Sequence, residues 1–172
     1  MYRLPSIMFL CVLLFLLPQF FQAAGTKGAS GAYDLADDRA AVEKVVRDSI
    51  GWALNKDKQL LLDSVAHDAD FFIFHPDSQS TIVGFEAFRK MVETVFMNEK
   101  FKATDFKVKD LRISLSKSGD VAWYSAYLDD HGEWDGRKTG WDDARWTGVV
   151  EKREGRWVIV QMHFSIASDK VK

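Results

Sequence analysis

Cysteine is nearly absent from this 172-residue chain, which contains one, Cys11, in an apolar run near its start. A domain that leaves out this run has no disulfide, no thiol nucleophile and no cysteine metal ligand. Runs of Lys and Arg are also lacking. The 23 basic residues are balanced by 25 acidic ones, which gives a formal net charge of −2. This balance argues against a nucleic acid as partner and against binding to an anionic membrane surface.

The first 25 residues have the pattern of a secretory signal peptide. Arg3 supplies a positive charge, residues 7–17 form an unbroken apolar run, and small residues follow at Ala24 and Gly25. Cleavage is expected after Ala24 or after Gly25. The apolar run is shorter than the ~20 residues that a membrane-spanning helix needs. We therefore expect a periplasmic or secreted protein with no membrane segment after cleavage.

The rest of the chain predicts one folded domain. Apolar residues make up 47% of the sequence and charged residues 28%, which is typical of a globular protein. Residues 26–36 are rich in small residues and predict a flexible leader, and residues 37–168 predict the domain itself. Without disulfides, its core alone must hold it together.

Helical periodicity comes first along this domain. Apolar residues recur every three or four positions from Val42 to Leu54, and Asp37 or Asp38 can cap this helix. A second helix is expected over about 58–66. A third begins after Gly84.

Strand periodicity follows the helices. An apolar run at 71–75 predicts a short strand, and alternating patterns predict four more, over 107–115, 120–129, 144–153 and 157–165. Residues 117–120 and 153–156 predict hairpin turns between them. Three helices followed by antiparallel strands predict the α+β fold class.

The last predicted hairpin carries a resemblance to a known superfamily. Residues 155–157 form a Gly-x-Trp turn, and the strand that follows ends in His-x-Ser at 163–165. A second feature is His-Pro-Asp at 75–77, followed by Gly84 before the third helix. In these features the chain resembles the SnoaL-like branch of the nuclear transport factor 2-like superfamily.

The resemblance implies a strongly curved antiparallel sheet wrapped around three N-terminal helices into a cone with an internal pocket. The superfamily includes isomerases, dehydratases, polyketide cyclases, hydrolases, transport factors and assembly domains. Association domains of calcium/calmodulin-dependent protein kinase II share the fold and a similar ending, and they oligomerise. The fold therefore leaves the function open.

Pairing the last two strands through the turn at Glu154 and Gly155 predicts which residues share a face. One face then grades from apolar near the turn to polar at its far end, as a pocket with a wet mouth would. The opposite face is uniformly apolar and suits a core or a dimer interface. The predicted pairs are Lys152 with Trp157, Val150 with Ile159, Gly148 with Gln161, and Trp146 with His163.

Two residues are candidates for acid–base catalysis. His163 can act as a general acid or base, as histidine often does in enzymes, or it can be a structural histidine bonded to a strand neighbour. Asp77 follows the first strand and is a candidate general base near the mouth, although Pro-Asp is also an ordinary turn pair.

The candidate ligand-binding residues are aromatic or polar. Trp146 can stack on a flat ligand or fill the sheet face. Gln161 needs a partner, because an unpaired buried amide costs ~1–3 kcal/mol. Trp123 and Tyr124 lie on opposite faces of one strand, and the pattern does not tell which of them faces inward. His75, at the end of the first strand, completes the set.

Residues 129–136 concentrate acidic residues around a histidine. Carboxylates and imidazole can bind a metal, but a glycine-containing loop enforces no coordination geometry. We interpret this segment as a solvated hairpin loop and predict no metal site and no cofactor.

Together these patterns predict an exported domain that binds a small apolar or aromatic molecule. Acid–base activity of the isomerase, cyclase or hydrolase type on that ligand is left open. A homodimer through the sheet is expected in either case. The alternative is a non-catalytic dimerisation or protein-interaction module of the same fold.

Overall fold

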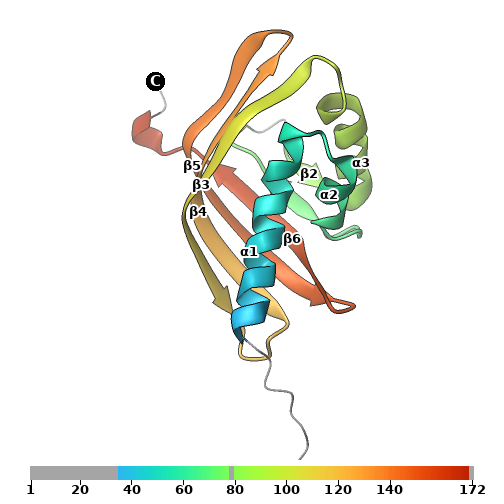
Figure 1. Ribbon diagram of the computed structural model, residues 1–172, viewed down its shortest axis with the longest axis vertical. Helices are drawn as coiled ribbons and strands as arrows, with labels where there is room; N and C mark the ends of the chain where they lie inside the picture. The colour runs from blue at the N-terminus through green and yellow to red at the C-terminus, as the bar shows by residue number, and fades with distance from the viewer. Residues whose placement is uncertain (1–34, 78–79, 171–172) are drawn as a thin grey trace, which may run out of the picture. The chain divides into compact units, whose positions relative to one another are not determined.

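The computed structural model describes residues 35–77 and 80–170. Within them, six strands form one curved, unclosed sheet in the order β2-β1-β6-β5-β4-β3, and helices pack on one of its faces (Figure 1). The α+β class expected from the sequence is confirmed. The expected signal peptide, residues 1–25, lies outside the described residues.

Helix α1, Leu35–Gly51, lies along the inner face of the sheet. It begins two residues inside the expected leader, so Asp37 and Asp38 stand in its first turn and not before it. Their negative charge still suits the start of a helix. The buried residues that follow are spaced three or four apart, as the apolar pattern predicts: Val42, Val45, Val46 and Ser49.

The remaining helical segments are short. The turn η1, Trp52–Leu54, leads to α2, Lys58–Asp63, whose first turn is capped by Asp57 through a 3.0 Å bond from Leu60 N to Oδ1. Helix α2 ends three residues before expected, because residues 64–66 extend along Ile159 and hydrogen-bond to its backbone. Helix α3, Phe85–Met91, continues as a π-helical turn, η2, over Val92–Phe96.

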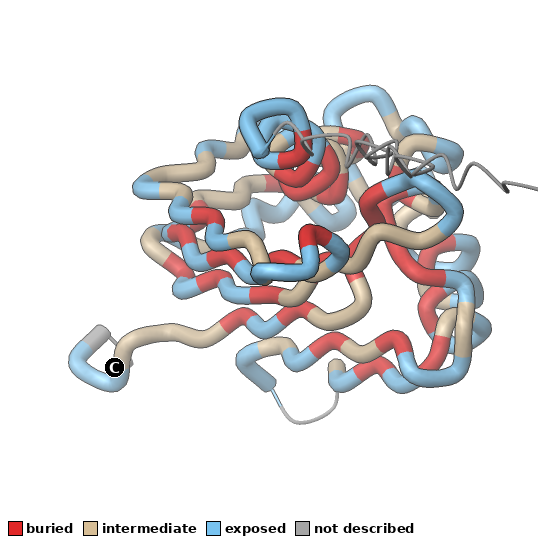
Figure 2. The backbone as a smooth tube through the Cα atoms, turned by 90° about the horizontal axis from the view of Figure 1, so that it is seen from below, coloured by how far each residue is buried: buried red, intermediate tan, exposed pale blue. Residues whose placement is uncertain are grey.

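The sheet contains one parallel pairing in an otherwise antiparallel order. Strand β1 pairs in parallel with β6, and every other neighbouring pair is antiparallel. Figure 2 shows buried and exposed residues alternating along the strands. The strands are β1 Phe72–Phe74, β2 Ile82–Val83, β3 Phe101–Leu115, β4 Val121–Trp134, β5 Arg137–Arg153 and β6 Arg156–Ser165, and a short turn η3, Ser168–Lys170, follows.

Strands β3, β4 and β5 are longer than the sequence pattern predicts. Residues 129–136, which we expected to be a solvated loop, are strand on both sides of a turn at Asp135 and Gly136. Both turn residues have positive φ, 53° and 76°, as a two-residue hairpin of matching twist requires. The loop interpretation was therefore wrong.

The predicted register of β5 and β6 is correct near the turn and wrong beyond it. The pairs Lys152–Trp157 and Val150–Ile159 are confirmed, but the next pair joins Val149 to Gln161, which leaves Val160 as an extra residue on β6. A bulge of one residue turns every later side chain to the opposite face. Gly148 accordingly pairs with Met162, and Trp146 pairs with Phe164.

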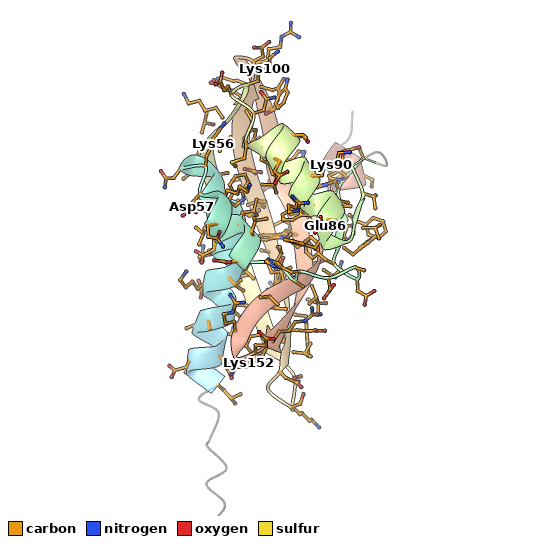
Figure 3. The ribbon with its side chains drawn as sticks, turned by 90° about the vertical axis from the view of Figure 1, so that its right-hand side faces the viewer. Lys56, Asp57, Glu86, Lys90, Lys100 and Lys152 are labelled. Carbon is orange, nitrogen blue, oxygen red and sulfur yellow. The ribbon has the colours of Figure 1, made fainter. Side chains whose placement is uncertain are left out.

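Asp38 fastens the start of α1 to the β5–β6 hairpin. Its Oδ1 accepts a 2.6 Å hydrogen bond from Lys152 Nζ and a 2.9 Å bond from Trp157 Nε1. These bonds hold the pKa of the Asp38 carboxyl below its usual range. Figure 3 shows Lys152 at the end of the sheet that lies beside the start of α1.

Candidate functional site

A cavity of about 380 Å³ lies between the helices and the inner face of the sheet. Figure 3 views this region with α1 on the left, α3, marked by Glu86 and Lys90, on the right, and the sheet behind. Most of the lining is apolar or aromatic. The polar residues that also line the cavity are Ser49, His75, Asp77, Ser80 and Asp130.

Two clusters of aromatic rings form much of the wall. In one cluster, the ring centroid of Trp52 lies 5.3 Å from that of Phe96. In the other, Phe164 stacks on His75 with centroids 5.4 Å apart and planes at 9°, and it also contacts Trp141 at 5.6 Å. Such walls favour a flat, apolar occupant over a polar one.

His75 is held in one orientation and one tautomer. Its Nδ1 lies 2.8 Å from the carbonyl oxygen of Ser80, which can only accept, so Nδ1 carries the proton. Burial lowers the pKa of His75, and the charge of Asp77 opposes this shift. The side chain of Asp77 is itself fixed, because Oδ1 accepts a 2.9 Å bond from Ser80 Oγ. Neutral His75 therefore keeps Nε2 as a proton acceptor.

Asp130 enters the cavity from β4. In this strand Tyr124, Ala126 and Leu128 are buried at alternate positions, and Asp130 continues the same face. Its pairing partner on the neighbouring strand β5 is Trp141, which also lines the cavity. Burial raises the pKa of Asp130, with a smaller opposing effect from His131. A carboxyl in this setting holds its proton to a higher pH and can donate it.

The structure brings two of the sequence candidates into this cavity. His75 and Asp77 line it, whereas His163 and Gln161 lie on the outer face of the sheet, opposite the helices. The cause is the extra residue Val160, which reverses the faces beyond it. The shared face predicted for Trp146, Gln161 and His163 was therefore wrong.

The other candidates lie beside the cavity or away from it. Trp123 faces outward and is 52% exposed, and Tyr124 faces inward. Trp146 is fully buried, and its ring centroid lies 5.0 Å from that of Tyr124. Neither Tyr124 Oη nor Trp146 Nε1 has a hydrogen-bond partner among the described residues. A Cβ at Gly148 would lie 2.5 Å from Tyr124 Oη, so glycine makes room for that hydroxyl.

The polar residues of the cavity do not form a metal-binding cluster. Within residues 35–77 and 80–170, no three His, Cys, Asp or Glu side chains gather as metal ligands would.

In the same part of the chain, no helix has the length and apolar character needed to cross a membrane.

Helices packed on a curved sheet with a cavity between them are the architecture of nuclear transport factor 2-like domains. The family model of the SnoaL-like domain matches residues 42–169. The chain therefore belongs to the SnoaL-like family, as its turn and strand motifs predict. A search of curated proteins found no match.

Solved structures share the fold at low sequence identity. A proposed aromatic ring hydroxylase from Novosphingobium aromaticivorans is 19% identical with a TM-score of 0.64, over 76% of this chain and 90% of that one. A nuclear transport factor 2-like protein from Cytophaga hutchinsonii is 18% identical with a TM-score of 0.59, over 75% and 98%. The association domain of calcium/calmodulin-dependent protein kinase II from C. elegans is 17% identical with a TM-score of 0.57, over 76% and 97%.

Proposed function

We propose that the domain binds a small, largely apolar or aromatic molecule in its cavity and transfers a proton to or from it through His75. The observation that carries this proposal is that a neutral histidine and a half-buried carboxyl both line a largely apolar cavity. Such a combination is typical of small-molecule sites that do acid–base chemistry. Isomerase, cyclase and hydrolase reactions all need such a proton transfer.

Each polar residue has a role in this proposal. His75 Nε2 takes the proton, because Nδ1 already donates to the Ser80 carbonyl. Asp77 stabilises the imidazolium that forms, since its charge raises the pKa of His75 against the effect of burial. Ser80 fixes both groups, through its carbonyl and its hydroxyl.

Native mass spectrometry of the full chain, paired with a denatured mass, tests whether the cavity is occupied. A ligand-sized excess in the native spectrum alone supports the proposal, and extraction then gives the class of compound. The site is tested with His75→Gln, which removes the proton acceptor and should abolish turnover or weaken binding while the fold is kept. If His163→Ala abolishes them and His75→Gln does not, the proposed site is wrong.

A second candidate function, assembly, is supported by the outer face of the sheet. Large apolar side chains stand exposed there: Trp123 by 52%, Phe74 by 47% and Tyr127 by 44%. Exposed aromatic residues of this kind are typical of protein interfaces. We propose a homodimer through this face, which is compatible with an occupied cavity, and light scattering of the purified chain measures its mass.

Export is also part of the proposal and rests on residues 1–25 alone. N-terminal sequencing of the protein recovered from its host should show a chain that starts at Gly25 or Thr26. A chain that still begins at Met1 would contradict it.

A further inference from the structure

The charged residues that line the cavity are all of one sign. Asp77 and Asp130 supply carboxyl groups, and none of the described lining residues is Lys or Arg. A ligand with a carboxylate, sulfonate or phosphate would therefore enter a largely apolar space without a counter-charge, near the carboxylate of Asp77. Burial of an unpaired anion is strongly unfavourable.

Among the described residues, Asp130 differs from Asp77 in accepting no hydrogen bond at its carboxyl. Asp77 accepts a bond from Ser80, whereas no described residue donates a hydrogen bond to the Asp130 side chain. Its strand neighbours Phe106 and Trp141 are aromatic. His131, the next residue along β4, is a charged neighbour only when protonated, and it contacts Asp142. A carboxyl group in these surroundings gives up its proton less readily than an exposed one, and in its protonated form it is a donor without an acceptor.

This inference rests on the proposed function, because it assigns the kind of molecule that the same cavity takes. We propose that the cavity selects uncharged aromatic molecules that present a carbonyl or hydroxyl oxygen to Asp130, and that it rejects carboxylates of the same shape. The acid donates to that oxygen, and His75 Nε2 accepts from a donor on the same molecule where one is present. Asp130 is thus a specificity-determining residue.

An organic cation is the other ligand that two acidic residues would suit. It would pair with an ionised Asp130 beside aromatic rings, so that two charges would stand in a partly desolvated space. Buried ion pairs of this sort gain little over neutral groups of the same shape. A hydrogen bond from the neutral acid carries no such penalty, so the uncharged ligand is favoured.

The cavity volume sets the size of a suitable probe. At ~30 Å³ per water, about 380 Å³ holds roughly a dozen water molecules. A naphthalene ring with one small substituent has a similar number of non-hydrogen atoms. 2-Acetylnaphthalene and 2-naphthoate are matched in ring, shape and number of non-hydrogen atoms, and differ in charge. 2-(Aminomethyl)naphthalene provides the cation, and naphthalene provides the ring alone.

The experiment is calorimetric titration of the full chain with each of these four probes at pH 7. The ketone should bind, and the carboxylate should bind at least about tenfold more weakly, because its charge is desolvated without a partner. Asp130→Leu should weaken ketone binding by about threefold to tenfold, the effect of one hydrogen bond, and leave naphthalene binding unchanged. Asp130→Asn keeps a donor and should retain the ketone.

Each result separates this inference from the proposed function. If naphthalene binds but the carboxylate or the ammonium compound binds as tightly as the ketone, the charge selectivity is refuted and the apolar site stands. Equal loss of naphthalene and ketone binding in Asp130→Leu would mean that the substitution damages the cavity. Asp130→Asn then tests the role of Asp130 as a donor, and loss of ketone binding in Asp130→Asn refutes that role. If no probe binds and the native mass shows no ligand, the proposed function fails and this inference fails with it.

Discussion

Gly140 is the position where one added methyl group should disturb both the fold and the cavity. It lies on β5 opposite His131, with φ at +133°, and a Cβ there would lie 2.1 Å from the carbonyl oxygen of Asp130. Only glycine adopts this backbone conformation readily, and forcing another residue into it costs about 1–3 kcal/mol. The clash adds about 1–3 kcal/mol, since β5 must move away from β4. Gly140→Ala should therefore lower the free energy of unfolding by about 2–6 kcal/mol.

The same substitution at Gly136 is the matched control. Gly136 also has positive φ, +76°, but an added Cβ there meets no atom within 4 Å. Gly136→Ala should lose only about 1 kcal/mol, from the left-handed backbone conformation. Thermal unfolding measures both variants, and at about 2–4 °C per kcal/mol Gly140→Ala should melt several degrees below Gly136→Ala.

The position of Gly140 also predicts an effect on ligand binding. Its neighbours in the β4–β5 pairing are Asp130 and Trp141, which both line the cavity. At a temperature where both variants are folded, Gly140→Ala should bind 2-acetylnaphthalene more weakly than Gly136→Ala does. Equal melting temperatures of the two variants would refute the close approach of β5 to β4, and with it this account of how the cavity wall is held.

Three further predictions concern the helix attachment, the proposed base and the outer face. Asp38→Ala should destabilise the domain by about 2–4 kcal/mol in urea unfolding, because Trp157 Nε1 is left buried without an acceptor. Since the pKa of Asp38 is lowered in the folded state, the unfolding free energies of wild type and variant should converge as the pH falls through that pKa. The pKa of His75 is lowered by burial, so the unfolded chain binds the proton more readily, and wild-type stability should fall as the pH drops below about 6.5. Urea titrations over this range should show a flatter profile for His75→Gln, and an unchanged profile would contradict the neutral, buried imidazole. Trp123→Ser combined with Tyr127→Ser should shift a dimer towards monomer in light scattering, and an unchanged mass would exclude this part of the outer face as the interface.

The sequence predicted the fold well where one periodicity was decisive. The buried residues of α1 recur at helical spacing, and the turn at Glu154 and Gly155 set the first pairs of β5 and β6 correctly. The pattern could not reveal the bulge at Val160. Residues 157–160 of β6 are apolar in succession, so a shift of one residue leaves both faces plausible. At the bulge β6 also changes its neighbour on the other edge, from residues 64–66 at Ile159 to β1 from Gln161 onward. Two candidate residues, His163 and Gln161, were assigned to the inner face for this reason.

Asp130 is a different case, because the sequence contained the evidence for its place in the cavity. Asp135-Gly136 is the kind of dipeptide that most strongly favours a two-residue hairpin, and it marks where β4 turns into β5. Extending β4 to that turn carries the alternation of Tyr124, Ala126 and Leu128 on to position 130, which places Asp130 on the inner face. The concentration of acidic residues hid this regularity, because a charged segment is expected to be solvated. An acidic residue that falls in phase with a buried face is therefore better interpreted as part of a site than as part of a loop, and the raised pKa of Asp130 is the physical result of that position.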